Sequence, residues 1–139
     1  MTAQMFLVVL MSLLHVRADY AACIRRNQTQ IADSANRSAE RFDVPVDVLL
    51  TVAYLESHLG CANGSGGCWG APINRSHRNQ AGGSDQAAAA LAWGYARCGS
   101  DLGAISHFRC GLCTCRRLRG YTPAQAMNLL TRIRERATP

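Results

Sequence analysis

The sequence predicts a small all-α domain built around one buried central helix and stapled by disulfides. Apolar residues recur at helical spacing through most of the chain, and no stretch alternates as a strand would. The segment Pro45–Gly60 is almost entirely apolar, which is typical of a helix that the rest of a fold surrounds. Seven cysteines in 139 residues indicate a disulfide framework in an oxidising compartment.

The N-terminus carries a predicted export signal. Nearly unbroken apolar sequence runs from Met5 to Leu14, which is the length of a signal-peptide core and too short for a membrane-spanning helix. Small residues predict cleavage after Ala18, with cleavage as late as residue 22 as the alternative. We therefore expect residues 1–18 to be a signal peptide. Residues 19–139 would form one domain in the periplasm or outside the cell, without a stable membrane span.

The charge pattern limits the class of partner. The formal net charge is +6, and every basic residue is an arginine. A basic exported protein is attracted to anionic surfaces such as a cell wall. Nucleic acid is a poorer expectation, because aromatic residues are few and no recognition motif accompanies the arginines. The sequence gives no sign of a cofactor.

The first half of the chain predicts two helices and a long loop. Thr29–Phe42 is amphipathic and ends before Pro45, because the residue preceding a proline is pushed out of the helical region. The central helix follows, with Asp47 near its positive end and Gly60 as its stop. A Gly-rich stretch then runs from Gly60 to Gly83, and loops of this length are often functional.

The second half predicts three helices. Ser84 suits the N-cap of an Ala-rich helix that runs to about Cys98, and its small residues would let another helix approach closely. Asp101 to about Phe108 fits one or two helical turns. Thr122-Pro123-Ala124-Gln125 has a capping-box pattern and begins a terminal helix that reaches about Arg136.

Glu56 is the candidate catalytic residue. It lies seven residues after Leu49 and three to four after Val52 and Ala53, which places it on the apolar stripe of the central helix. Burial disfavours the charged form of a carboxyl group, and a protonated carboxyl group is the acid that cleavage of a glycosidic bond requires. The plainer alternative is a solvated glutamate at a helix end.

The cysteines allow two interpretations. As disulfide candidates we take Cys61, Cys68, Cys98, Cys110, Cys113 and Cys115. A Cys61–Cys68 bridge would pin the loop beside Glu56, and Cys23 is the candidate for the odd cysteine. Alternatively, His107 with Cys110, Cys113 and Cys115 has the spacing of a structural zinc site. The export signal favours disulfides, so no metal is expected.

Three aromatic residues, Trp69, Trp93 and Tyr95, have rings that could stack on sugars. A core position is the favoured interpretation for Trp93. His58 either faces a cleft or caps the end of the central helix as a cation.

The stretch F-D-V-P-V-D-V-L-L-T-V-A-Y-L-E-S, which ends at Glu56-Ser57 before a Gly-rich loop and Trp69-Gly70, resembles the first motif of lytic transglycosylases of the SLT type. More distantly it resembles goose-type lysozymes. The resemblance covers roughly Ile31 to Ala137 and implies a lysozyme-like fold. It also implies that Glu56 is the sole catalytic acid and base, beside a matching Ser57.

Later motifs of that family are only partly matched. Gly70-Ala71-Pro72-Ile73 stands where the family has Gly-Leu-Met-Gln, with Asn74 as a substitute for the glutamine. Phe108 takes the place of a tyrosine whose hydroxyl reaches the glutamate, and Arg109 takes the place of an asparagine. Gly120-Tyr121 resembles the tyrosine before the family's last helix. The substrate-binding candidates are Ser57, Trp69, Gly70, Asn74, Phe108, Arg109 and Tyr121.

The resemblance implies cleavage of peptidoglycan between N-acetylmuramic acid and N-acetylglucosamine, in which the sugar's own 6-hydroxyl attacks and leaves a 1,6-anhydro end. One carboxylate suffices for that reaction. A lysozyme-type hydrolase, with Asp85 positioning a water, is one alternative. A non-catalytic protein that binds the cell wall or assists a secretion or envelope machine is the other.

Overall fold

The computed structural model describes residues 1–63 and 83–139, and within these ranges the protein is helical without a strand. The elements in chain order are α1 (Ala3–Leu13), α2 (Ala18–Arg26), α3 (Gln28–Phe42), α4 (Val46–Ser57), the short 3₁₀ helix η1 (Cys61–Asn63), α5 (Ser84–Cys98), α6 (Asp101–Cys110) and α7 (Pro123–Ala137). The predicted all-α class is confirmed.

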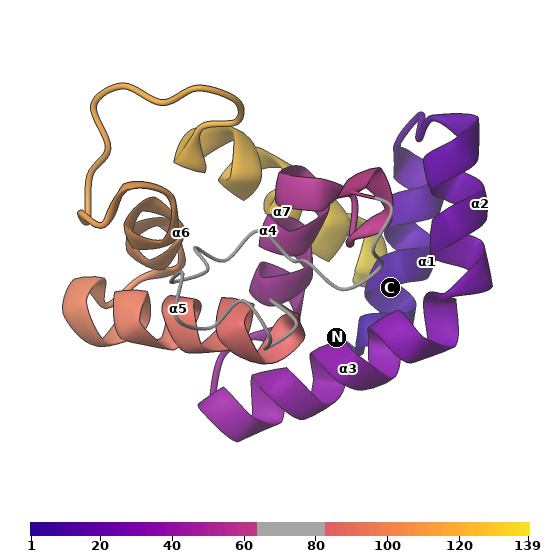
Figure 1. The fold of residues 1–139 in the computed structure, drawn as a ribbon, viewed down its shortest axis with the longest axis horizontal. Helices are drawn as coiled ribbons and strands as arrows, with labels where there is room; N and C mark the ends of the chain where they lie inside the picture. The colour runs from indigo at the N-terminus through magenta and orange to yellow at the C-terminus, as the bar shows by residue number, and fades with distance from the viewer. Residues whose placement is uncertain (64–82) are drawn as a thin grey trace.

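Helix α4 lies at the centre of the molecule, with the other helices around it (Figure 1). Every residue from Asp47 to Tyr54 is buried, including the polar Thr51. Because the helix is apolar on nearly all sides, it packs against α1, α3, α5 and α7 at once. This confirms the prediction of one buried central helix.

Helix α1 comes from the predicted signal segment and packs against α3, α4 and α7. Its residues Phe6, Leu7 and Leu10 have no exposed surface. Cleavage after residue 18 stays a prediction, and in a cleaved chain these contacts would be lost. Helix α2, which the sequence patterns did not predict, begins at Ala18, the last residue before the predicted cleavage point.

Helices α5 and α6 pack against each other more extensively than any other two described elements, and α6 lies above α5 in Figure 1. Gly94 permits the contact, because a Cβ at this position would lie 2.9 Å from the backbone of Ala104. The small residues of α5 therefore do allow close approach. The sequence predicted Ser84 as the N-cap, which is wrong, because Ser84 is the first helical residue after Gly83. Helix α6 extends two residues beyond Phe108.

Helix α7 begins as the sequence predicts. The Thr122 hydroxyl accepts a hydrogen bond from the Gln125 backbone N–H at 3.1 Å, and the Gln125 side chain accepts one from the Thr122 N–H at 2.8 Å. Pro123 occupies the first turn, where no N–H is needed. The capping box is thus confirmed, and it fixes the start of α7 directly after Tyr121.

The disulfides correct two predictions. Cys23 pairs with Cys61, so Cys23 is not the odd cysteine and Cys61 does not pair with Cys68, which lies outside the described residues. Bridges Cys98–Cys113 and Cys110–Cys115 tie the segment after α6 to the α5–α6 pair. These sulfurs are not free thiolates, which removes the zinc alternative.

Three disulfides indicate an oxidising, non-cytoplasmic compartment. Among the described residues, no helix has both the length and the apolar character that crossing a bilayer requires.

Candidate functional site

Glu56 lies in the last turn of α4, and the backbone after it turns sharply. His58, Leu59 and Gly60 all have positive φ angles of 51°, 60° and 85°. The buried Ser57 hydroxyl holds this turn, since it donates to the Ala53 carbonyl at 3.2 Å and accepts from the Gly60 N–H at 2.9 Å. With 1% of its surface exposed, Ser57 has a structural task here, and its predicted substrate contact stays a prediction.

Two donors converge on one oxygen of Glu56. The Tyr121 hydroxyl donates to Oε1 at 2.8 Å, and Nη1 of Arg109 lies 3.3 Å from the same atom. The Glu56 side chain is 17% exposed, and that of Arg109 is 15% exposed. The carboxylate is therefore largely shielded, but by polar partners from the far end of the chain rather than by the apolar stripe of α4 alone.

Arg109 is itself held in place by the segment that precedes α7. Its Nη2 donates to the carbonyl oxygens of Arg119 and Tyr121, and its guanidinium lies 4.2 Å from the centre of the Tyr121 ring. Its Nε is buried without a hydrogen-bond partner among the described residues. A buried donor left unpaired costs about 1–3 kcal/mol, which is the kind of cost that functional sites carry.

Tyr121 remains a hydrogen-bond donor over the physiological pH range. Burial raises the pKa of its hydroxyl far above the usual value, and the neighbouring charge of Glu56 and the hydrogen bond to it raise it further. Arg109 opposes this change only in part. The hydroxyl therefore stays protonated and available to Oε1. Phe108 has no hydroxyl with which to reach the glutamate, so Tyr121 makes the contact that the family resemblance assigned to a tyrosine at position 108.

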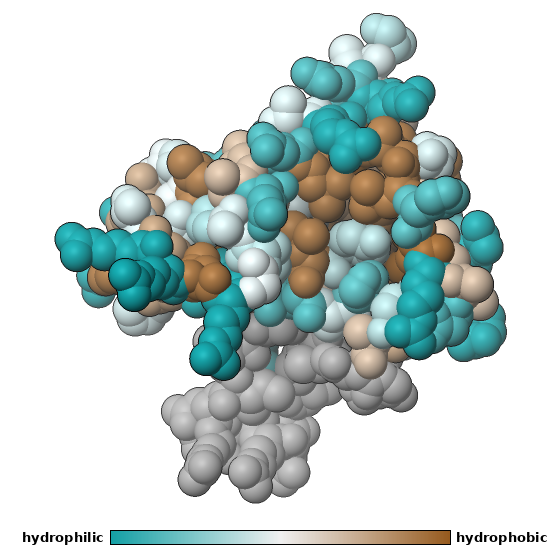
Figure 2. All heavy atoms as spheres, turned by 90° about the horizontal axis from the view of Figure 1, so that it is seen from above, coloured by the Kyte–Doolittle hydropathy of each residue, from teal (hydrophilic) through white to brown (hydrophobic). Residues whose placement is uncertain are grey.

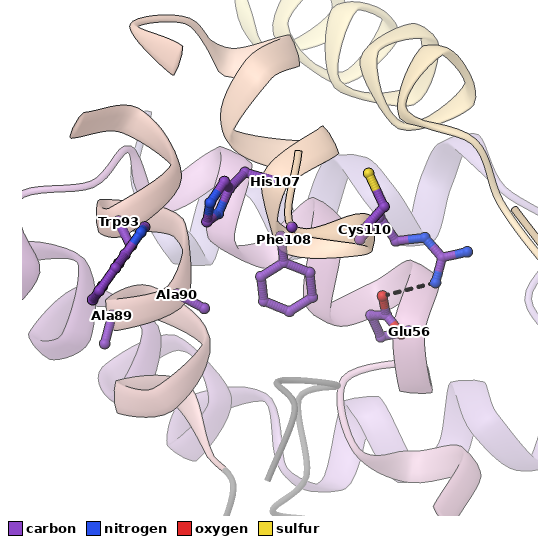
Figure 3. Close-up of a pocket in the computed structure, with 9 residues that line it drawn as sticks. Glu56, Ala89, Ala90, Trp93, His107, Phe108 and Cys110 are labelled. Atoms are coloured by element: carbon purple, nitrogen blue, oxygen red, sulfur yellow. Dashed lines mark hydrogen bonds and ion pairs between the residues drawn. The ribbon is translucent and has the colours of Figure 1, made fainter. Parts of the chain in front are cut away.

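A cavity of about 700 Å³ opens beside Glu56. Figure 3 shows Glu56 at one end of this cavity and Trp93 at the other, with His107 and Phe108 between them. The lining residues are Glu56, Ala89, Ala90, Trp93, His107, Phe108, Arg109, Cys110 and Gly111. A mostly apolar wall with a few convergent polar groups and a volume of this size is typical of a ligand site.

The core position favoured for Trp93 is wrong, because this residue is 61% exposed at the cavity edge. The reason is its position on α5. Ala87, Leu91 and Gly94 form the buried side of that helix, whereas Ala89, Ala90 and Trp93 lie on the side that faces the cavity. Sequence reasoning missed Ala89 and Ala90 as lining residues, although their spacing of three to four residues before Trp93 indicates a shared face.

The other predicted site residues have varied positions. Phe108 and Arg109 line the cavity, and Tyr121 reaches Glu56. The substrate-binding candidates Trp69, Gly70 and Asn74 lie outside the described residues.

Two further predicted residues take structural positions. Tyr95 donates to Asp101. His58 packs against the rings of Tyr20 and Tyr54. Burial and the charge of Arg17 lower the pKa of His58, which disfavours the cationic cap, one of the two alternatives for this residue.

The remaining acids near helix starts have structural partners. Asp85 accepts from Ser38 at 2.7 Å and pairs with Arg41 at 2.9 Å, across the contact of α3 with α5. Asp101 pairs with Arg134 at 3.0 Å. Among the described residues that line the cavity, Glu56 is the one carboxylate.

Comparison of the chain with protein-family models, with curated proteins and with solved structures gave no match. The function is therefore inferred from the geometry of the site and from the motifs in the sequence.

Proposed function

We propose that the protein is a peptidoglycan lytic transglycosylase that cleaves the β-1,4 bond between N-acetylmuramic acid and N-acetylglucosamine. One observation carries this proposal. Glu56 is the single carboxylate in the described lining of a ligand-sized cavity, and two donors hold one of its oxygens. The resemblance of the α4 sequence to the first motif of SLT-type enzymes supports the choice of substrate.

The geometry suits an acid that later serves as a base. Within the described residues, both donors to Glu56 contact Oε1, so a proton on Oε2 competes with neither of them. In the proposed reaction Oε2 gives this proton to the glycosidic oxygen, and the bond from that oxygen to C1 of muramic acid breaks. Arg109 and Tyr121 stabilise the carboxylate that remains.

The second half of the reaction returns the proton to Glu56. The carboxylate takes the proton of the 6-hydroxyl of the same muramic acid, and that oxygen forms a bond to C1. The product is a 1,6-anhydro sugar, and Glu56 is again protonated. No water is consumed, so no second carboxylate is needed to activate one. Hydrolysis by the inverting route would require a second carboxylate across the cavity as general base, and Asp85 is engaged with Ser38 and Arg41 instead.

A non-catalytic wall-binding protein is the second candidate, and the ion pair of Glu56 with Arg109 favours it. Arg109 links Glu56 to the carbonyl groups of Arg119 and Tyr121. In this alternative, Glu56 would serve only to anchor the segment before α7. The same fold and cavity would then bind glycan without cleaving it.

Mass analysis of sacculi digested by the purified protein separates the three candidates. A transglycosylase releases muropeptides that are lighter by one water than the reducing products of a hydrolase. We expect the anhydro products. Reducing products would replace the proposal with the hydrolase, and binding to sacculi without any soluble product would replace it with the wall-binding protein.

A further inference from the structure

A group of arginines projects from the segment between α6 and α7. This segment, residues Gly111–Gly120, is called the arm here. Arg116, Arg117 and Arg119 are all exposed on it, and among the described residues no acidic side chain pairs with any of them. The sequence contains no Asp or Glu between Asp101 and Glu135. Like charges that lie so close together repel one another unless an anion is bound.

The arm is fixed rather than loosely attached. Cys113 is bonded to Cys98 of α5, and Cys115 is bonded to Cys110, the last residue of α6. Arg109 holds the last part of the arm through the carbonyl of Arg119. Arginines on such a preorganised segment lose less conformational entropy when they bind a ligand.

The arm also adjoins the candidate site. It begins at Gly111, which lines the cavity, and it ends just before Tyr121, which donates to Glu56. Figure 2 views the molecule from the side on which the arm lies in Figure 1, and hydrophilic side chains project at the left edge of this face. A polymer bound in the cavity would therefore lie beside Gly111, the first residue of the arm.

We propose that the arm binds the carboxylates of the peptides carried by the glycan strand, so that the site selects peptide-bearing glycan over bare glycan. This inference rests on the proposed function for its choice of polymer. Guanidinium groups form paired hydrogen bonds with carboxylates, and the peptides of peptidoglycan are attached to the muramic acid at the scissile bond. Arg116 and Arg117 are the main contacts.

Binding to insoluble sacculi tests the arm without relying on cleavage. The Glu56→Gln protein is compared with the same protein carrying Arg116→Gln and Arg117→Gln. A matched control carries Arg132→Gln and Arg136→Gln, which remove the same charge from exposed positions of α7. We expect the arm variant to bind native sacculi roughly tenfold more weakly, and the control to bind within about twofold of the parent.

Sacculi whose free carboxylates have been converted to amides identify the ligand. On these, the parent protein should bind as weakly as the arm variant, and both should bind chitin equally. Equal weakening of the arm variant and the control would overturn the proposal, because it would show a general charge effect. A difference that persists on amidated sacculi, or tighter binding of the arm to duplex DNA than to sacculi, would also overturn it. Absence of cleavage by the wild-type protein would refute the proposed function and leave this comparison intact.

Discussion

The two ends of α4 each carry a carboxylate paired with an arginine, and the two pairs differ in how many acceptor positions are taken. At the start of the helix, both oxygens of Asp47 are engaged. Arg134 donates to Oδ2 at 2.7 Å and to Oδ1 at 3.3 Å, and the Val48 N–H donates to Oδ1 at 2.9 Å. At the other end, the two contacts that Glu56 makes with described side chains are both made by Oε1.

The neighbours of the two carboxylates differ as well. Asp47 lies beside a second cavity, of about 590 Å³, that Met1 and Met5 also line, and its partner Arg134 is shared with Asp101. Glu56 borders the cavity that Trp93 and Phe108 line. A carboxylate with both oxygens engaged stabilises a fold, whereas one that keeps an oxygen without a partner among the described residues can exchange a proton with a ligand in the cavity beside it. The comparison assigns structure to one end of α4 and chemistry to the other.

The largest expected effect on stability is for helix α1, which packs against α4. Phe6→Ala removes a fully buried ring from α1 and should lower the free energy of unfolding by about 3–5 kcal/mol in the full-length chain. Val8→Ala on the same helix is the control, because Val8 is 60% exposed. Denaturant unfolding measures both. Equal, small effects would contradict the packing of α1, and mass analysis of the exported protein would establish whether residues 1–18 are retained.

Asp47→Asn should destabilise the protein without slowing cleavage per folded molecule. Arg134 loses its charged partner, but its side chain is 39% exposed, so water replaces part of the pairing and the loss should be about 1–3 kcal/mol. The exposed Asp33 offers a control as Asp33→Asn. A strong loss of cleavage with unchanged stability would reverse the roles assigned to the two ends of the helix.

Tyr121→Phe removes one donor from Oε1 and keeps the ring. We expect a loss of about 0.5–1.5 kcal/mol in stability and roughly a tenfold lower cleavage rate. Tyr95→Phe, which removes the bond to Asp101, should cost similar stability and leave the cleavage rate unchanged. If both variants cleave at the same rate, the hydroxyl of Tyr121 has no part in the reaction.

The smallest effect on stability is expected for Trp93→Ala. The side chain is exposed, so unfolding should change by less than about 0.5 kcal/mol. Loss of the ring should weaken glycan binding roughly two- to tenfold if sugars stack on it. Leu102→Ala is the control, because Leu102 is 46% exposed and is not among the cavity residues. Unchanged binding by the Trp93 variant would remove that end of the cavity from the site.

The fold was predictable from the sequence where periodicity and caps are local. Thr122 and Gln125 predicted the start of α7, and the apolar run after Pro45 predicted a buried α4. The Cys23–Cys61 bond was not predictable, because it depends on α2 reaching η1 across a distance that no local pattern encodes. Helix α2 was also missed, since it has only nine residues and its start coincides with the predicted cleavage point.

The candidate site was predictable only in part. The position of Glu56 followed from its spacing after Leu49 and Val52, and the motifs brought Arg109 and Tyr121 into consideration. Their convergence on one oxygen is a tertiary contact across more than fifty residues. Trp93 was misassigned because a tryptophan in an Ala-rich helix resembles a core residue, and its exposure depends on which side of α5 faces α6.

The cleavage rate of the Glu56→Gln protein tests the role of Glu56 most directly. Glutamine keeps the shape of the side chain and its acceptor for Tyr121 but has no proton to give to a glycosidic oxygen. Release of soluble muropeptides should fall about 10²–10⁴-fold, while Glu135→Gln at an exposed position of α7 should cleave at the wild-type rate. Release by Glu56→Gln at the wild-type rate would contradict the assignment of Glu56 as the acid.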